Sequence, residues 1–453
     1  MLSLDKADLV NSSYKEVTSY QEAENYLLRV PKFAKKNTVE DTGIFLDVLG
    51  NPGCSKKIIH VAGTNGKGSV CAYLSSILCT AGYSVGMFTS PHLIEMRERF
   101  RVDGIPVERK EFVEAFHQVM GNLEDMRKSC KCEDYHPTFF ELLFLMGMII
   151  FEQKKTDFII LETGLGGRLD ATNCINNPIL SVITEIGLDH MQYLGDTIEE
   201  IAGEKAGILK QSVPVVFSDK RKESSEVIVK RAETLGIQAF PVKKEDYFDV
   251  KVTNKNIDFS FHSRYYNYIR LSITARALYQ VENAALAVRC IETLDTRHSI
   301  TEKQIKSGIK KTIWEGRMEE VLPDVYVDGA HNEDGIRAFV ETVECDGCVG
   351  RRYLLFSASL DKDYDTMIRL LEKNQLFEKT AVAKFNNPRT AALKQMQEVF
   401  EKYDAKDCTY HEDVQNALKC LISEKEEKDY IYIVGSLYLV GEIKAMIGRK
   451  TDD

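Results

Sequence analysis

The chain has 453 residues, of which 44% are hydrophobic and 28% are charged. This length and composition are typical of a globular protein with two or three domains, at roughly 150 residues for each domain. The formal net charge of −10 argues against nucleic acid as a partner, because proteins that bind polyanions usually carry a basic stripe. An anionic substrate must therefore be met by a local cluster of basic side chains, backbone N–H groups or metal ions.

No segment of the sequence favours a membrane or an exported location. Residues 1–6 lack the apolar stretch of a signal peptide. The longest apolar run, residues 142–151, is shorter than the ~20 residues that span a bilayer, and it predicts a buried helix. The 11 cysteines favour reduced thiols and hence a cytoplasmic protein. Cys345 and Cys348 have the spacing of a zinc motif but no histidine partner nearby, so we expect ordinary thiols.

Residues 15–50 carry helical patterns, and a strand follows at 58–62. This strand leads directly into the glycine-rich segment 63–69. Its glycines let backbone N–H groups turn towards an anion, Lys67 adds a positive charge, and Ser69 lies at the start of the next helix, where phosphate and Mg²⁺ gather. The segment departs from the P-loop pattern, which has an earlier glycine and a Ser or Thr directly after the lysine. We nevertheless expect it to bind a nucleoside triphosphate.

Strands and helices continue to alternate along the first two thirds of the chain. Further strands are expected at residues 85–88, 158–161, 180–183 and 213–217. Polar clusters follow the first three of them, at residues 89–92, 162–167 and 184–190. This rhythm predicts a mostly parallel sheet with helices on both faces. Because ligands bind at the carboxyl ends of strands in such sheets, we expect these clusters to form one composite site.

A second alternation begins near residue 325. Before it, residues 240–275 predict a few antiparallel strands, and helices are expected at 277–294 and 301–313. The later strands are expected at 325–327, 353–356, 380–383 and 430–434, with a helix at 335–343. We therefore predict an α/β fold with three parts: a P-loop-type, mostly parallel sheet domain over residues 1–315, a linker over 316–323, and a smaller Rossmann-like domain over 324–453.

Several longer motifs occur along nearly the whole chain. They are Thr89–Leu93, Leu161–Asn173, Ile183–Met191, Leu194–Ile208, Gln280–Asn283, Trp314–Arg317 and Asp328–Asn332. In this order the set closely resembles folylpolyglutamate synthase/dihydrofolate synthase, a family of the Mur ligase superfamily. The resemblance implies an ATP-dependent amide ligase. ATP would phosphorylate a carboxylate of a pterin-containing substrate, and the amine of L-glutamate would attack the resulting acyl phosphate.

The resemblance also implies where ATP and metal ions bind. Ser90, Glu162 and His190 look like the family's ligands for Mg²⁺, with two ions expected, and a monovalent cation is left open. The guanidinium of Arg317 suits a γ-phosphate because it stays charged and offers forked donors. The residues expected to contact ATP are Thr64, Asn65, Gly66, Lys67, Gly68, Ser69, Asn283, Arg317 and Asp328.

Two residues are expected to take part in catalysis. Read alone, Lys205 would be a surface lysine on a helix, but the resemblance implies that it is carbamylated and so becomes anionic. Such a change makes sense beside a cation, where an ammonium group would be repelled. His331 is expected to orient glutamate or the departing phosphate, with glutamate near the second domain and Ser436.

The pterin ring is expected to meet three segments of the first domain. Phe139 and Phe140 could stack on a flat heterocycle or belong to a helix core, and Asp41 or Asp170 could accept hydrogen bonds from its amino groups. The full set, taken from matched positions, is Asp41, Thr42, Gly43, Ile44, Thr138, Phe139, Phe140, Glu141, Leu169, Asp170 and Ala171.

Two other functions remain alternatives on the sequence alone. One is a Mur-superfamily ligase that builds a cell-wall peptide, with the same chemistry on another carboxylate. The other is a P-loop ATPase or GTPase that acts as a switch and needs no acceptor. We expect small-molecule substrates, no nucleic acid, no membrane and a monomer. The choice between dihydropteroate and tetrahydrofolate, or the use of both, stays open.

Overall fold

The computed structural model describes residues 14–30, 37–133, 135–253, 256–295 and 297–448. The chain forms two compact units. Unit 1 comprises Met1–Ile186, Glu199–Val242 and Leu286–Gly308. Unit 2 comprises Gly187–Ile198, Lys243–Ala285 and Ile309–Asp453. The expected domains of residues 1–315 and 324–453 stay a prediction.

Unit 1 is built on an eight-stranded sheet in the order β4-β3-β2-β5-β1-β6-β7-β8. Neighbouring strands from β2 to β8 pair in parallel, whereas β3 and β4 are antiparallel additions at one edge. The strands are β1 (Lys57–Ala62), β2 (Val85–Phe88), β3 (Phe100–Val102), β4 (Ile105–Pro106), β5 (Phe158–Glu162), β6 (Leu180–Ile183), β7 (Val215–Ser218) and β8 (Ala239–Val242). Their runs of Val, Ile and Leu suit a sheet that is buried on both faces. The prediction of a mostly parallel sheet is confirmed.

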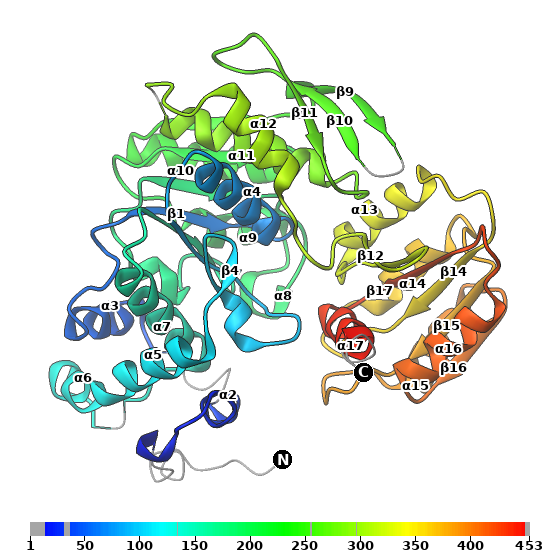
Figure 1. Ribbon diagram of the computed structural model, residues 1–453, viewed down its shortest axis with the longest axis horizontal. Coiled ribbons are helices and arrows are strands. Elements are labelled where there is room, and N and C mark those ends of the chain that lie inside the picture. The colour runs from blue at the N-terminus through cyan, green and yellow to red at the C-terminus, as the bar shows by residue number, and fades with distance from the viewer. Residues whose placement is uncertain (1–13, 31–36, 134, 254–255, 296, 449–453) are drawn as a thin grey trace. The chain divides into compact units, whose positions relative to one another are not determined.

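Helices cover this sheet, and Figure 1 shows α3, α5 and α7 gathered on the same side of β1. The apolar run predicted to be a buried helix lies in α7, whose residues from Leu142 to Phe151 are all buried. They form one core with α2, α5 and the facing strand residues. The helices are η1 (Tyr14–Glu16), α2 (Tyr20–Arg29), α3 (Val39–Val48), α4 (Lys67–Thr80), η2 (Met96–Arg99), α5 (Arg109–Gly121), α6 (Leu123–Cys130), α7 (Phe139–Gln153), η3 (Ala171–Cys174) and α10 (Lys222–Leu235).

Three helices, α9 (Ile198–Ala206), α11 (Gln280–Leu294) and α12 (Glu302–Lys311), have residues in both units. Over the described part of the chain, no helix is both long and apolar enough to cross a membrane.

Unit 2 contains two sheets. The predicted antiparallel strands are β9 (Tyr247–Val252), β10 (Ile257–Phe261) and β11 (Ile269–Ile273), with β10 in the centre. The larger sheet has the order β12-β13-β17-β14-β15-β16 and is parallel from β13 to β16. Its strands are β12 (Glu319–Leu322), β13 (Val325–Val327), β14 (Arg352–Phe356), β15 (Lys379–Ala383), β16 (Cys408–His411) and β17 (Tyr430–Val434).

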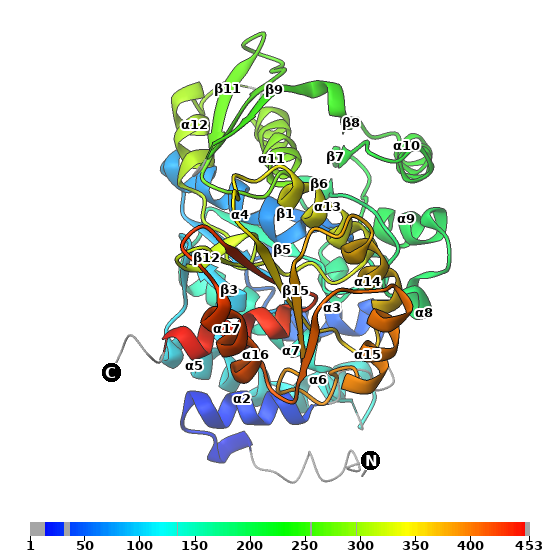
Figure 2. The same cartoon turned by 90° about the vertical axis from the view of Figure 1, so that its right-hand side faces the viewer.

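Helices lie on both faces of the larger sheet. Figure 2 shows α14 and α15 on one side of it and α16 and α17 on the other. Alternate strand residues, such as Leu354 and Phe356, form one core with α13, α14 and α15. The helices that lie wholly within unit 2 are α8 (Met191–Leu194), η4 (Lys244–Asp246), α13 (Glu333–Glu344), α14 (Tyr364–Glu372), α15 (Leu393–Lys402), α16 (Val414–Glu424) and α17 (Leu437–Gly448).

The segment predicted as a linker, residues 316–323, is partly a strand. Glu319–Leu322 forms β12, which pairs antiparallel with β13. Asp324 turns the chain between them with a φ of 58°, a conformation that aspartate tolerates better than most residues. The hairpin therefore extends the sheet at the point where a linker was expected.

Candidate active site

The glycine-rich segment forms a tight loop between β1 and α4. Gly63 has a φ of 151° and Gly66 one of 85°. A Cβ on Gly63 would lie 1.8 Å from Thr184 Oγ1, so this position has no room for a side chain. Thr184 Oγ1 donates to the carbonyl of Asn65 at 2.6 Å, and two loop N–H groups donate to the Glu185 carbonyl. The end of β6 thus fixes the loop before any ligand binds.

Two lysines meet at this loop. Lys67 Nζ donates to the carbonyls of Gly63 and Thr64, at 3.1 Å each. Lys205, on α9 and 4% exposed, donates from Nζ to the same Gly63 carbonyl at 2.8 Å. The predicted phosphate residues and the predicted catalytic lysine are therefore brought together. Carbamylation of Lys205 stays a prediction, and the Gly63 bond is compatible with it because a carbamate nitrogen keeps one N–H.

Ser90 and Glu162 also meet, at the carboxyl ends of the adjacent strands β2 and β5. The backbone N–H of Ser90 donates to Glu162 Oε2 at 2.9 Å, and Glu162 is buried. A carboxylate and a hydroxyl are the oxygen ligands that Mg²⁺ accepts, with phosphate and water completing its shell. Within the described ranges, no group of three or more His, Cys, Asp or Glu could hold a metal ion. The pair therefore fits an ion that also binds nucleotide, rather than a closed protein site.

In unit 2, Asp328 lies at the carboxyl end of β13 and is buried. Its carboxylate accepts hydrogen bonds from Tyr279 Oη at 2.6 Å, from the Met318 N–H at 3.0 Å and from the Ala330 N–H at 2.8 Å. Burial raises the pKa of Asp328 above its usual range, although the charge of Arg317 and these hydrogen bonds oppose the rise. The carboxylate is thus held rigidly by groups that the sequence did not connect with it.

Arg317 lies close to this carboxylate. Its Nη1 donates to the Gly316 carbonyl at 2.8 Å, and a Cβ on Gly329 would lie 2.4 Å from the same nitrogen. Gly329 therefore leaves room for the guanidinium. The two predicted ATP contacts Arg317 and Asp328 belong to one local arrangement, although the strand β12 separates them in the sequence.

The predicted residue His331 belongs to a cluster that sequence reasoning missed. Asp189 Oδ1 accepts from Lys362 Nζ at 2.5 Å, and Asp189 Oδ2 accepts from Asn332 Nδ2 at 3.1 Å and lies 3.6 Å from His331 Nε2. His331 Nδ1 lies 2.8 Å from the Gly329 carbonyl. Burial favours a higher pKa for Asp189, but the hydrogen bond and charge of His331, with the charge of Lys362, hold that pKa well below its usual range.

One signal for this cluster was present in the sequence. Asp189 lies beside the predicted metal ligand His190, in the motif Ile183–Met191. His190 itself is the N-cap of α8, with a φ of 52°. Asn283 lies in the first turn of α11, where its Nδ2 donates to Gln280 Oε1 at 3.0 Å. The roles of His190 in metal binding and of Asn283 in ATP binding stay predictions.

The predicted pterin residues occupy three neighbouring segments of unit 1. The segments are Asp41, Thr42, Gly43 and Ile44 on α3, Thr138 to Glu141 at the start of α7, and Leu169, Asp170 and Ala171 at the start of η3. Helices α3 and α7 both contact η3, and a Cβ on Gly43 would lie 3.7 Å from Cys174 Cβ.

The acidic residues of this set already have partners. Asp41 and Thr38 form the capping box of α3, and Glu141 and Thr138 form that of α7. Such reciprocal bonds satisfy backbone N–H groups at a helix start. Asp170 accepts two hydrogen bonds on each carboxylate oxygen. These carboxylates therefore shape the segments, and they are less available to a heterocycle than the sequence suggested.

Phe139 and Phe140 were expected either to stack on a heterocycle or to belong to a helix core, and the structure places the two rings differently. Phe139 is buried, with the Arg99 guanidinium 5.5 Å from its ring centre. Phe140 is half-buried and lies over Gly164, where a Cβ would come within 2.6 Å of its ring. Leu169 is 49% exposed. Ile44 is also half-buried, so Ile44, Phe140 and Leu169 are the apolar side chains of the set that are not fully buried.

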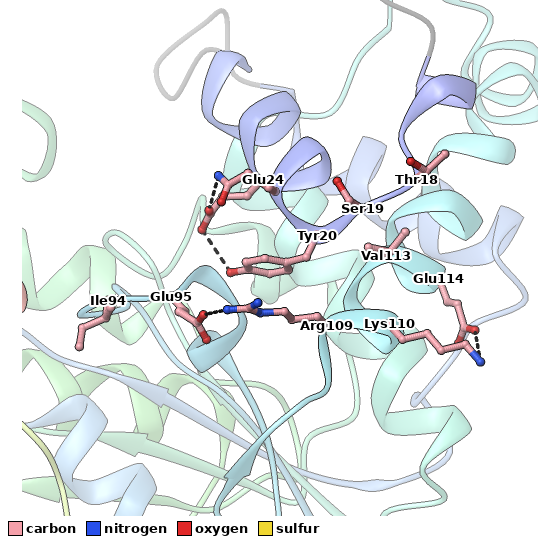
Figure 3. Close-up of a pocket in the computed structure, with 11 residues that line it drawn as sticks. Thr18, Ser19, Tyr20, Glu24, Ile94, Glu95, Arg109, Lys110, Val113 and Glu114 are labelled. Carbon is pink, nitrogen blue, oxygen red and sulfur yellow. Dashed lines mark hydrogen bonds and ion pairs between the residues drawn. The ribbon is translucent and has the colours of Figure 1, made fainter. Parts of the chain in front are cut away.

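A hollow of about 770 Å³ in unit 1 contains none of the predicted residues. Figure 3 shows Arg109 paired with Glu95, and Tyr20 bonded to Glu24, along its wall. The Arg109 guanidinium also lies 5.4 Å from the centre of the Tyr20 ring. The charges of Arg109 and Glu95 satisfy each other, so the hollow offers little to the triphosphate or the carboxylate of the expected reaction.

Two family domains together match most of the chain. Residues 61–291 match the Mur ligase middle domain, and residues 316–437 match the Mur ligase, glutamate ligase domain. The dihydrofolate synthase/folylpolyglutamate synthase of Bacillus subtilis is 36% identical over 436 residues, which are 94% of this chain and 99% of that protein.

Two solved structures share the fold over almost the whole chain. FolC of E. coli, in complex with DHPP and ADP, has a TM-score of 0.82 at 27% identity and covers 96% of this chain and 99% of its own. Folylpolyglutamate synthase from Thermotoga maritima has a TM-score of 0.79 at 30% identity, with 95% and 97% covered. The chain therefore belongs to the Mur ligase family, in its dihydrofolate synthase/folylpolyglutamate synthase branch. It is an ATP-dependent ligase.

Proposed function

We propose that this chain joins L-glutamate to the carboxyl group of folates and of dihydropteroate, with ATP as the source of energy. The observation that carries the proposal is the meeting of the phosphate loop, Lys205 and the Ser90–Glu162 pair at the carboxyl ends of β1, β2 and β5. A switch ATPase needs no such set. The B. subtilis relative, whose name gives both activities, supports glutamate and pterin substrates.

The reaction has two steps. A carboxylate oxygen of the pterin substrate attacks the γ-phosphorus of ATP, the bond to the bridging oxygen breaks, and ADP leaves. The amine of glutamate then attacks the carbonyl carbon, the tetrahedral intermediate loses phosphate, and the amine gives up a proton. Phosphoryl transfer depends on position and on neutralised charge, and the backbone N–H groups of the loop and Lys67 supply both.

Mg²⁺ fits the donor set described above. Glu162 and Ser90 would hold it in unit 1, and it would neutralise the repulsion between carboxylate and triphosphate. The role of His190 as a metal ligand stays a prediction. The expectation of two ions stays part of the proposal. Carbamylated Lys205 would add a negative group next to them.

The cluster around Asp189 contains His331, the residue expected from the sequence to orient glutamate. Lys362 pairs with Asp189, and His331 Nε2 lies 3.6 Å from the same carboxylate, so Asp189 fixes the positions of both side chains. We assign glutamate to this region. We further propose a cytoplasmic monomer. The 11 cysteines are all free thiols, which suits a reducing compartment.

A pair of variants tests the central assignment. Glu162→Gln keeps the shape of the side chain and removes its charge, so we expect ligation to fall by about 100-fold or more. Glu114→Gln, at an exposed ion pair with Lys110, should leave the rate unchanged. Ligated product is measured by mass spectrometry, and thermal unfolding checks that both variants fold. Near-normal turnover in Glu162→Gln would refute the assignment.

A further inference from the structure

A chain of buried hydrogen bonds connects β1 with the loop of residues 163–173, which carries the last group of predicted pterin contacts. His60 Nε2 lies 2.8 Å from Thr172 Oγ1, and Thr172 Oγ1 lies 2.6 Å from Asp170 Oδ1. On the other oxygen, Asp170 accepts from the N–H groups of Gly164 and Leu165 at 2.9 and 3.0 Å. His60 and Thr172 are fully buried, and Asp170 is 3% exposed.

The direction of each bond follows from the chemistry of the groups. A carboxylate only accepts, so the single proton of the Thr172 hydroxyl goes to Asp170. The hydroxyl oxygen must then accept from His60, whose proton therefore lies on Nε2. His60 Nδ1 is buried and has no hydrogen-bond partner. Burial, with a smaller contribution from Lys210, lowers the pKa of His60 to about 3, so the ring is neutral.

The same loop is attached on its other side to α9, the helix of Lys205. The Arg168 N–H donates to the Glu204 carbonyl at 2.7 Å, and the Arg168 guanidinium pairs with the Glu204 carboxylate. Asn173 Nδ2 donates to the carbonyls of Arg168 and Gly207. With one side held by α9, the hydrogen bonds from β1 decide the shape of the segment from Gly164 to Asp170.

We propose that His60 is a positioning residue for the pterin substrate, which fixes Thr172 and Asp170 and through them the loop that receives the ring. Asp170 contributes by holding the Gly164 and Leu165 N–H groups. This inference rests on the proposed function.

Steady-state kinetics of matched variants test the proposal. His60→Leu removes the donor, and Thr172→Val removes the hydroxyl, so we expect either change to raise the KM for the pterin substrate about tenfold. The KM for ATP should stay within about twofold. His60→Gln places an amide N–H where Nε2 stood and should restore the pterin KM. The double variant should be no worse than His60→Leu, because both changes break the same connection.

Thr156→Val is the control, since Thr156 is also buried and its hydroxyl bonds to the Phe151 carbonyl at 3.3 Å. It should leave both KM values unchanged. An equal rise in the KM for ATP, additive effects in the double variant, or an unchanged pterin KM in His60→Leu would each overturn the proposal.

A measurement on the unliganded wild-type chain separates this inference from the proposed function. The ¹⁵N shifts of the His60 ring should show a proton on Nε2 and none on Nδ1 at about pH 5, where an ordinary histidine is charged. A proton on Nδ1, or a charged ring, would overturn the proposal. A wild-type chain that shows the expected tautomer and ligates no glutamate would instead refute the proposed function.

Discussion

Half-buried carboxyl groups behave in two ways in unit 2, depending on their partners. Asp189 is surrounded by Lys362, Asn332 and His331, which favour its charged form. Glu372 ends α14, and its Oε1 is buried without a hydrogen-bond partner. Burial raises the pKa of Glu372 to about 7, and a negative charge at a helix C-terminus is also disfavoured by the helix dipole.

Glu372 therefore predicts a pH dependence of stability. The folded pKa lies above the ordinary value of 4.5, so the unfolded chain loses its proton first as the pH rises. As the pH rises from 4.5 to about 7, the free energy of unfolding falls, because the folded protein must then hold the charged carboxylate. Above about pH 7 the destabilisation is complete. With allowance for solvent screening, we expect Glu372→Gln to raise the free energy of unfolding by about 1 kcal/mol at pH 8 and by little at pH 4.5.

Urea unfolding of the whole chain at both pH values measures this difference. Glu398→Gln on α15 changes an exposed glutamate and should have no effect at either pH. If Glu372→Gln raised the free energy of unfolding equally at both pH values, the effect would not come from the ionisation of Glu372.

At the level of single residues, the sequence indicated which chemistry a side chain could support. It gave less information on which other side chains lie in contact with it. Glu162, Ser90 and Lys205 could be assigned from their motifs, and the structure places them at one edge of the sheet in unit 1. Lys362 gave no signal, because its partner Asp189 lies 173 positions earlier in the chain. Asp41 or Asp170 was expected to accept hydrogen bonds from the heterocycle, and nothing in the sequence shows that the folded loop already bonds to both oxygens of Asp170.

Among the connections between elements, the loop from β1 to α4 is constrained by close contact at Gly63. Gly63 and Gly82 both have positive φ angles, 151° and 96°. A Cβ would meet Thr184 Oγ1 at Gly63, but nothing within 4 Å at Gly82. Substitutions at the two glycines can therefore separate the effect of a steric clash with Thr184 from the effect of a strained backbone conformation.

We expect Gly63→Ala to weaken ATP binding at least tenfold, which is about 1.4 kcal/mol, because the loop must move to admit the methyl group. Gly82→Ala should lose about 1 kcal/mol of stability from backbone strain and keep its affinity for ATP. Isothermal titration with a non-hydrolysable ATP analogue measures both affinities. Equal affinities in the two variants would show that the loop does not hold the nucleotide as proposed.

The elements themselves were largely predictable. The strands at 85–88, 180–183, 325–327 and 430–434 have the expected bounds, because short runs of apolar, β-branched residues lie between turn signals. The helix expected from residue 277 begins at Gln280 instead. Strand β12 was not predicted, because Glu319 and Glu320 make this edge strand as polar as a connecting loop. Its pairing with β13 is set by tertiary structure rather than by pattern.

Across the whole molecule, the predicted site residues are carried by both units. Unit 1 carries the phosphate loop, Ser90, Glu162, Lys205 and the predicted pterin residues, and unit 2 carries His190, Asn283, Arg317, Asp328 and His331. The family domains match both parts of the chain. Because each unit carries predicted residues, the full chain is the right object for the decisive experiment.

That experiment is the release of inorganic phosphate from ATP and Mg²⁺ by the full chain, with L-glutamate and the pterin substrate omitted in turn. Tetrahydrofolate and dihydropteroate are tested separately as the pterin. Because the phosphate leaves only when an amine displaces it from an acyl phosphate, the account predicts sustained release only with glutamate and a pterin both present. Release at the same rate when both are absent would contradict a ligase and indicate a nucleotide hydrolase.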